Sequence, residues 1–131
     1  RLAFSEDGKI LASGSLDGTV GISDPVTGDE LHALYGHKAP VHDIIILPGH
    51  RRLVSADMGG GFIKLWDITS GQFVEDIGRH SAGWYGGVGS LACTPDGRTL
   101  VSGRDVVGAH LPMPLRLGLR VWQVPQTSFQ Q

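Results

Sequence analysis

Serine, histidine and aspartate, the side chains of hydrolytic triads, recur in this sequence at similar intervals. Ser13, Ser55 and Ser102 are separated by 42 and 47 residues, and His37 recurs 43 residues later as His80. A hydrolytic site needs one exposed nucleophile, a base and an oxyanion pocket. Here each serine lies in a short apolar run that is typical of a strand, and the whole group is repeated. The repetition favours a structural device over a catalytic centre.

Two other chemistries find little support in the residue spacing. The six histidines show no H-x-x-x-H spacing and the chain has no C-x-x-C pair, so we expect no metal and no cofactor. The run Gly59-Gly60-Gly61 could form a phosphate loop, but no Lys followed by Ser or Thr comes after it and no helix is predicted there. We expect these glycines to enlarge a hairpin turn. Cys93 is expected to be a small core residue.

The elements that must position these residues are expected to be strands. Glycine accounts for 20 of the 131 residues without a three-residue period, and short Val, Ile and Leu runs alternate with turn residues. Many tight turns that join short strands give this pattern. The hydrophobic content of 40% is enough for a buried core. The chain is therefore predicted to be all-β.

Charge and hydropathy argue against several classes of partner. The formal net charge is -2, and the one local basic cluster, Arg51-Arg52 beside His50, is typical of a solvated turn. No apolar run approaches the roughly 18 residues of a membrane span. The single cysteine cannot form an internal disulfide, which is compatible with a reducing compartment. We expect an intracellular protein, cytoplasmic or nuclear, that binds neither nucleic acid nor a membrane.

Aligning the sequence with itself reveals a repeat. Each copy contains three apolar runs that end in turn residues, and the third runs are Thr19–Asp24, Phe62–Asp67 and Leu119–Gln123. The best-formed copy starts with Gly36-His37 and ends with Trp66-Asp67. A period of about 40–45 residues with a Gly-His start and a Trp-Asp end is typical of one four-stranded propeller blade.

On these residues the chain resembles the WD-repeat (WD40) family, from Leu2 to about Val124. The resemblance implies an all-β β-propeller fragment of about three blades of four-stranded antiparallel sheet, the last blade lacking its outer strand. Blade one is expected at 1–35 and incomplete at its start, blade two at 36–78, blade three with loop insertions at 79–124, and a tail at 125–131. Because propellers close a ring of about four to eight blades, the chain is expected to belong to a longer protein or to associate with copies of itself.

The resemblance also gives the recurring polar residues a role. In the family, whose strands a to d run from the inside of a blade outward, a His before strand a, a Ser or Thr on strand b, an Asp at the b–c turn and a Trp on strand c form a hydrogen-bonded tetrad. It implies tetrads of His37, Ser55, Asp57 and Trp66 in blade two and of His80, Ser102, Asp105 and Trp122 in blade three. Blade one offers Ser13 and Asp17, but Ser23 occupies the Trp position. We therefore expect blade one to be the most loosely fixed.

Blade three departs from the repeat by two insertions, one before its strand a and one between its strands b and c. Both are expected on the same rim, because strands alternate in direction. Aromatic, Met and Arg side chains are enriched in protein interfaces. The partner-binding candidates are Trp84, Tyr85, Leu111, Met113, Leu115 and Arg116. The alternative is that the longer insertion folds over the blade and buries its own apolar side chains.

The sequence thus predicts a protein–protein interaction scaffold. It would present a rigid binding face to partner proteins or peptides and pack against the remaining blades of its parent propeller. The alternative is a sensing or substrate-recognition propeller section of a larger multidomain enzyme or signalling protein. No feature of the sequence supports an enzyme that acts from these residues, so the chain itself is expected not to be an enzyme.

Overall fold

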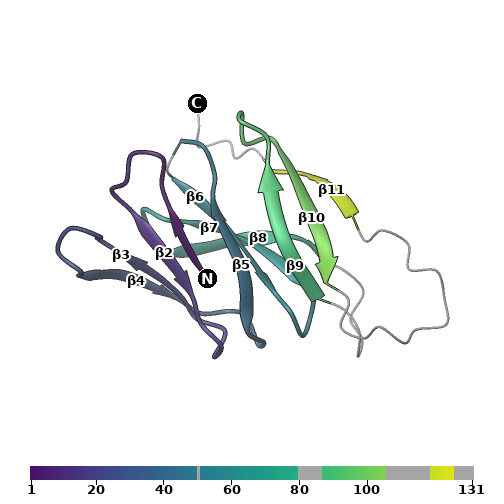
Figure 1. Cartoon of the computed structure of the whole chain (residues 1–131), viewed down its shortest axis with the longest axis horizontal. Coiled ribbons are helices and arrows are strands. Elements are labelled where there is room, and N and C mark those ends of the chain that lie inside the picture. The colour runs from purple at the N-terminus through teal and green to yellow at the C-terminus, as the bar shows by residue number, and fades with distance from the viewer. Residues whose placement is uncertain (50, 80–86, 106–118, 126–131) are drawn as a thin grey trace.

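Three antiparallel sheets packed side by side make up the computed structural model of the chain, which describes residues 1–49, 51–79, 87–105 and 119–125 (Figure 1). Within these ranges the sheets contain four, four and three strands. The prediction of an all-β propeller fragment is confirmed. In each sheet the strands lie in chain order, so every strand pairs with its neighbours in sequence.

The first sheet is built from short strands that end in tight turns. Its strands are β1 (Leu2–Phe4), β2 (Leu11–Gly14), β3 (Val20–Ser23) and β4 (Glu30–Leu34). The turn between β2 and β3 requires glycine at position 18. Gly18 has a φ of +90°, and a Cβ there would lie 2.5 Å from the carbonyl oxygen of His37. A side chain at this position would be strained and would collide with the connection to the second sheet.

The second and third sheets repeat this arrangement with longer strands. The second sheet contains β5 (Val41–Ile46), β6 (Arg52–Asp57), β7 (Phe62–Asp67) and β8 (Gln72–Arg79). The third contains β9 (Gly87–Cys93), β10 (Thr99–Asp105) and β11 (Leu119–Gln123). The inner strands of these sheets, β5 and β9, are joined by a side chain. The carboxylate of Asp43 accepts a hydrogen bond of 2.7 Å from the backbone N–H of Leu91.

The second sheet lies between two hydrophobic cores, because successive residues of a strand point to opposite faces. Trp66 packs with Val20, Ile22 and Leu34 of the first sheet. Leu65 packs on the other face of β7, with Val88 and Leu100 of the third sheet. A Cβ on Gly78 of β8 would lie 2.1 Å from the indole of Trp122, so this glycine allows the third sheet to approach. The second sheet is thus the buried centre of the described residues.

Among the described residues, nothing covers the outer faces of the first and third sheets. Leu2 and Phe4 of β1 are exposed, whereas Ala3 between them packs against the first core. In β11, Leu119 and Val121 are exposed, whereas Trp122 packs against the second core. Exposed apolar faces of this kind are typical of surfaces that a neighbouring element covers.

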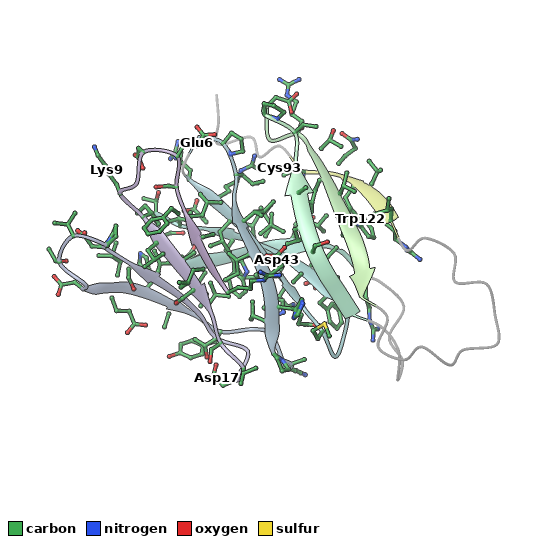
Figure 2. All side chains as sticks on the ribbon, in the orientation of Figure 1. Glu6, Lys9, Asp17, Asp43, Cys93 and Trp122 are labelled. Atoms are coloured by element: carbon green, nitrogen blue, oxygen red, sulfur yellow. The ribbon has the colours of Figure 1, made fainter. Side chains whose placement is uncertain are left out.

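The connections lie at two opposite ends of the sheets. Figure 2 shows Glu6 and Lys9, in the turn between β1 and β2, at one end, and Asp17, in the turn between β2 and β3, at the other. The connection from β4 to β5 lies at the end of Asp17, since the backbone N–H of Val41 donates to the carbonyl oxygen of Ser15. We call this end the Asp17 rim. It consists of the β2–β3 turn, the β4–β5 connection and the β6–β7 turn.

Candidate functional site

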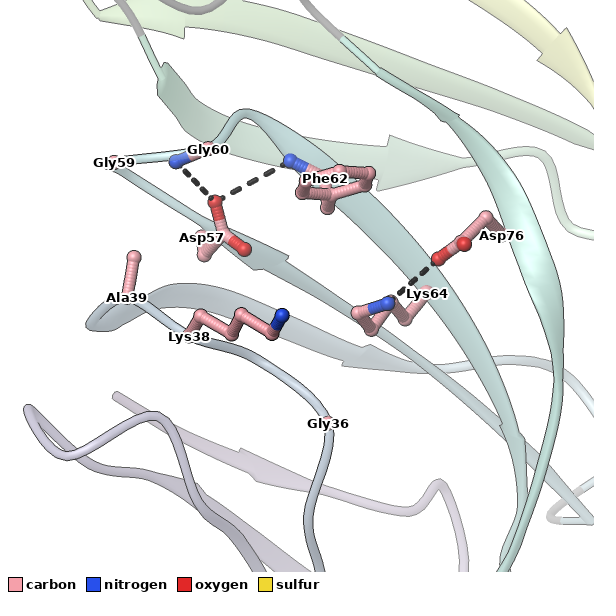
Figure 3. Close-up of a pocket in the computed structure, with 9 residues that line it drawn as sticks. All are labelled: Gly36, Lys38, Ala39, Asp57, Gly59, Gly60, Phe62, Lys64 and Asp76. Atoms are coloured by element: carbon pink, nitrogen blue, oxygen red, sulfur yellow. Dashed lines mark hydrogen bonds and ion pairs between the residues drawn. The ribbon is translucent and has the colours of Figure 1, made fainter.

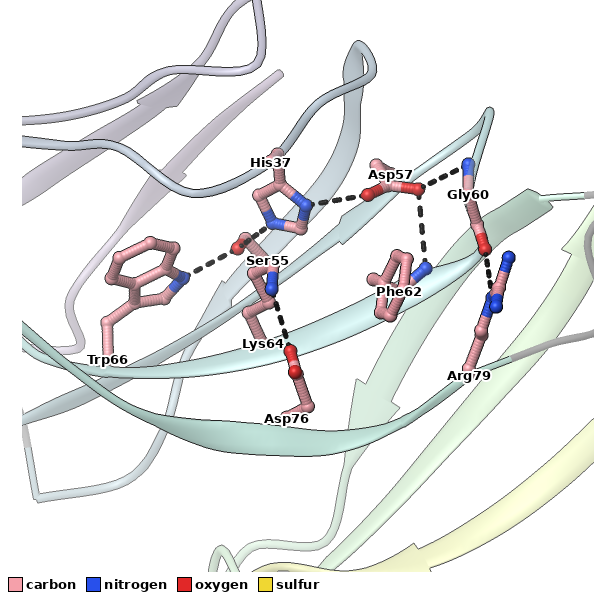
Figure 4. A network of polar contacts seen from close by, with 9 residues as sticks. All are labelled: His37, Ser55, Asp57, Gly60, Phe62, Lys64, Trp66, Asp76 and Arg79. Atoms are coloured by element: carbon pink, nitrogen blue, oxygen red, sulfur yellow. Dashed lines mark hydrogen bonds and ion pairs between the residues drawn. The ribbon is translucent and has the colours of Figure 1, made fainter.

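Four polar side chains meet inside the second sheet, at the Asp17 rim (Figure 4). The indole N–H of Trp66 donates to Oγ of Ser55 at 2.8 Å. Oγ of Ser55 lies 2.6 Å from Nε2 of His37, and Nδ1 of His37 lies 2.8 Å from Oδ2 of Asp57. The structure therefore brings His37, Ser55, Asp57 and Trp66 together in one continuous hydrogen-bonded chain.

The directions of these hydrogen bonds follow from the donors that are present. An indole N–H can only donate, so Oγ of Ser55 accepts from Trp66 and is free to donate its own proton to Nε2 of His37. His37 then carries its proton on Nδ1 and donates it to the carboxylate of Asp57. Each of the four side chains obtains a partner in this way. Buried polar groups cost free energy unless they are paired, so the chain of four is stable only as a complete set.

Asp57 connects this network to the β6–β7 turn. Its Oδ1 accepts the backbone N–H groups of Gly60 at 2.9 Å and Phe62 at 3.3 Å. Burial by itself raises the pKa of Asp57, but the hydrogen bond from His37, together with the two backbone N–H groups, holds this pKa below its ordinary value. The carboxylate stays ionised, and it fixes both the turn and the imidazole.

This cluster has the side chains and the hydrogen-bond order of a hydrolytic triad, but not the exposure to substrate that catalysis requires. Ser55 is fully buried, and its Oγ already accepts the indole N–H of Trp66. A nucleophile must reach its substrate, and a general base must be able to take a proton from it. Here the hydroxyl is covered on one side by Trp66 and on the other by His37. The arrangement fixes the connection between the sheets and offers no site for a substrate.

The third sheet repeats part of the same contact. The indole N–H of Trp122 donates to Oγ of Ser102 at 2.8 Å, and Ser102 is fully buried. The backbone of Asp105 pairs with Gly87, while the side chain of Asp105 lies outside the described part of the structure. His80, the proposed histidine of this blade, also lies outside the described residues.

The first sheet places its candidate residues differently. Ser13 is half-buried and pairs across the strands with Gly21, at the same register that Ser55 has with Lys64. Asp17 lies in the exposed turn, where its carboxylate accepts the backbone N–H of Thr19 at 2.8 Å. Backbone and side-chain hydrogen bonds from Thr19 lower the pKa of Asp17. Asp17 therefore caps its own turn, in a position unlike that of Asp57.

The partner-binding candidates lie outside the described residues. They are Trp84, Tyr85, Leu111, Met113, Leu115 and Arg116. Their role stays a prediction from residue type and from the position of the insertions in the repeat.

A pocket that the sequence did not reveal lies beside the tetrad on the Asp17 rim (Figure 3). Its volume is about 530 Å³, and its walls come from the β4–β5 connection, the β6–β7 turn, β7 and β8. The lining residues are Gly36, Lys38, Ala39, Asp57, Gly59, Gly60, Phe62, Lys64 and Asp76. The sequence held one signal for this pocket. Side chains alternate between the two faces of β7, so Phe62 and Lys64 lie on the same face as Trp66.

Cationic side chains surround the aromatic ring of this pocket. The ammonium group of Lys64 lies 5.1 Å and the guanidinium group of Arg79 lies 4.6 Å from the ring centre of Phe62. Lys64 also donates to Asp76 at 2.7 Å, and Nε of Arg79 donates to the carbonyl oxygen of Gly60 at 2.8 Å. These contacts hold the Phe62 ring between two positive charges.

Residues 1–49, 51–79, 87–105 and 119–125 hold no group of three or more His, Cys, Asp or Glu side chains that could bind a metal ion. In the same ranges, no helix has the length and apolar character that crossing a membrane requires. Cys93 is half-buried, and burial followed by the charges of Glu6 and Asp96 raises the pKa of its thiol.

Comparison with known proteins adds independent information. Residues 1–24 and 28–67 match the family profile described as WD domain, G-beta repeat. The chain is similar to "Target of rapamycin complex subunit wat1" of Schizosaccharomyces pombe, with 36% identity over 76 residues, which is 58% of this chain and 24% of that protein. "Small ribosomal subunit protein RACK1z" of Arabidopsis thaliana is also 36% identical over 76 residues, covering 58% of this chain and 22% of that protein.

A third relative matches a longer part of the chain. "U3 small nucleolar RNA-associated protein 15 homolog" of Xenopus tropicalis is 33% identical over 94 residues, which is 71% of this chain and 17% of that protein. The aligned segment is thus about a quarter or less of the length of each of these curated relatives.

Proposed function

The chain belongs to the WD-repeat family, and from this premise we propose that it is a section of a propeller that acts as a protein–protein interaction scaffold. The observation that supports this function best is the buried tetrad of the second sheet. Its polar side chains hydrogen-bond to one another and hold the β4–β5 connection against the second sheet. They therefore make the Asp17 rim rigid. A rigid surface binds with a smaller loss of conformational entropy than a mobile one.

The tetrad also supports the proposal that this chain is not itself an enzyme. Its hydroxyl and imidazole are the side chains that match a hydrolytic triad, and both are buried. The alternative function, recognition of a substrate on behalf of a catalytic domain elsewhere in a longer protein, is favoured by no feature of the described residues.

The relatives support a role inside larger assemblies. Their names refer to a target of rapamycin complex, a small ribosomal subunit and a small nucleolar RNA. We propose an intracellular location and protein or peptide partners for this chain as well. Any assembly with RNA would be reached through protein contacts, because the net charge of -2 gives the chain no electrostatic attraction for a polyanion.

We propose that partners contact the insertions of blade three, and mutation tests this directly. In the full-length protein, Trp84 and Tyr85 are replaced together by Ala, and partners are quantified by affinity capture and by direct titration of each one identified. A tenfold or greater loss of affinity for at least one partner is expected, since aromatic anchors carry much of the binding energy at interfaces. The same measurement on Lys9→Ala, at the opposite end of the sheets, serves as the control. Unchanged affinity for every partner would overturn the assignment of these two residues.

A further inference from the structure

We propose that the pocket beside the tetrad is a docking site for a short acidic segment of a partner protein, one that combines carboxylate side chains with an apolar residue. This inference rests on the proposed scaffold function and names the chemistry of one class of partner. It concerns the outer half of the second sheet, where β7 and β8 meet the β4–β5 connection, and it does not involve the insertions of blade three.

The shape of the site is fixed by the tetrad. Asp57 binds the backbone N–H groups of Gly60 and Phe62 and, through His37, the β4–β5 connection. The two main walls of the pocket are therefore held at a constant separation by one buried carboxylate. A site that is already formed before binding needs little rearrangement when a partner segment enters.

Glycines keep the walls close to the ring without filling the space. A Cβ on Gly60 would lie 2.8 Å from Cδ2 of Phe62, and a Cβ on Gly59 would lie 2.8 Å from Cβ of Ala39. A larger residue at either position would press on its neighbour and change the pocket. The volume of about 530 Å³ is in the range of pockets that accept one or two side chains.

The balance of charge at the pocket favours an anionic partner. Asp57 is buried, and both of its carboxylate oxygens accept hydrogen bonds, one from His37 and the other from the β6–β7 turn. Asp76 is paired with Lys64. Lys38 is exposed, and no described residue forms an ion pair or hydrogen bond with its ammonium group. Of the charged residues that line the pocket, Lys38 is therefore the one that the described residues leave unpaired (Figure 3). A carboxylate of a partner would find in Lys38 a cationic donor that has no acceptor among the described residues.

An apolar surface lies on the other side of the same connection. Leu16 and Tyr35 are 85% and 75% exposed. The turn that carries Leu16 packs on the β4–β5 connection, since Val41 donates to the carbonyl oxygen of Ser15 and Gly18 abuts His37. A segment that crosses this connection could place carboxylates near Lys38 and an apolar side chain on Leu16 and Tyr35. Large exposed apolar side chains beside a charged pocket are typical of interaction surfaces.

The experiment uses the full-length protein and synthetic peptides in which Asp or Glu alternates with Leu or Phe. Fluorescence anisotropy measures the affinity of these peptides and of otherwise identical peptides that carry Asn and Gln. Lys38→Glu reverses a charge on an exposed side chain, so the fold is retained, and circular dichroism checks this. The matched control is Lys9→Glu, which makes the same charge change at the opposite end of the sheets.

The expected result is that acidic peptides bind the wild-type protein more tightly than the amide peptides do. Lys38→Glu should weaken the acidic peptides by about fivefold or more, while Lys9→Glu leaves their affinity within about twofold. Replacing Leu16 by Ser should weaken the same peptides without changing the preference for acidic over amide side chains. Binding that is equal for acidic and amide peptides, or equal losses in the two lysine variants, would overturn the proposal. So would displacement of the peptide by single-stranded RNA, which would indicate a site for phosphate backbones.

The experiments distinguish a failure of the proposed docking pocket from a failure of the scaffold function. Partner capture that depends on Trp84 and Tyr85, with no binding of acidic peptides, would leave the scaffold in place and remove this pocket from its binding surfaces. Loss of all partner binding would instead remove the proposed function itself.

Discussion

The first and second sheets have the same strand order, and their second and third strands pair in the same register, yet only the second sheet closes a tetrad. Ser13 pairs with Gly21 as Ser55 pairs with Lys64, so the two serines occupy equivalent positions. Two residues after Gly21 comes Ser23, whereas two residues after Lys64 comes Trp66, which is only 2% exposed. A four-stranded blade therefore forms without the tetrad. Alternating apolar residues and the correct turns are sufficient for its backbone.

What the tetrad adds is the attachment of a blade to its neighbour at the rim. In the second sheet, side chains join the incoming connection, β6, β7 and the β6–β7 turn. The first sheet reaches the same connection through backbone contacts, by the hydrogen bond of Val41 to Ser15 and the close approach of Gly18 to His37. Stability at the Asp17 rim is thus concentrated in the second sheet, and four experiments measure how strongly.

The largest effect is expected from Trp66→Ala. Trp66 is buried between the first and second sheets, so its removal leaves a large cavity and removes one hydrogen bond from the Ser55 hydroxyl. We expect the free energy of unfolding to fall by about 3–5 kcal/mol. Ser23→Ala at the equivalent position should change it by no more than about 0.5 kcal/mol. Urea denaturation of both variants measures the difference, and similar midpoints would contradict the comparison.

The next effect is expected from Asp57→Ala. The change leaves Nδ1 of His37 and the backbone N–H groups of Gly60 and Phe62 without their acceptor. A loss of about 3 kcal/mol is expected, because these donors are buried. Asp17→Ala is the matched variant, and its effect should be much smaller because its exposed turn can bond to water. Thermal unfolding of the two variants checks this; an equal loss for Asp17 would mean that turn capping, and not burial, decides the contribution.

A smaller effect is expected from Ser55→Ala. Without the hydroxyl, the Trp66 indole N–H and Nε2 of His37 both lose a buried partner, at a cost of about 2 kcal/mol. Ser13→Ala should cost less than about 0.5 kcal/mol, since Ser13 is half-buried and belongs to no tetrad. Chemical denaturation under identical conditions gives both values. The comparison fails if the two serine variants lose the same stability.

The smallest effect concerns the dependence of stability on pH. The pKa of Asp57 in the folded protein is held below its ordinary value, so its ionised form stabilises the fold above a pH of about 4. This contribution is lost as the pH falls through the folded pKa. In Asp57→Asn the free energy of unfolding should therefore decline less steeply below a pH of about 4 than in the wild type. Unfolding midpoints measured across that range test the expectation, and an unchanged acid slope would refute it.

Much of the fold could be predicted because it depends on local patterns. The repeat interval, the Gly-His and Trp-Asp dipeptides and the turn glycines pointed to strands of the correct type in the correct order. The residues chosen for the tetrad of blade two are the four that the structure brings together. The pocket could not be predicted in the same way. Its walls come from connections and strands spread over residues 36 to 76, and their separation depends on how two sheets pack.

Sequence alone determined the all-β architecture, the repeat and the loss of a tryptophan at position 23. These depend on residue types at fixed spacings, and backbone geometry converts such spacings directly into strands and turns. Only the tertiary structure decided that the triad-like side chains of blade two are sealed from substrate. It also decided that Phe62, Lys38 and Lys64 line one pocket. Burial and the convergence of side chains from separate strands are properties of packing, and no spacing along the chain encodes them.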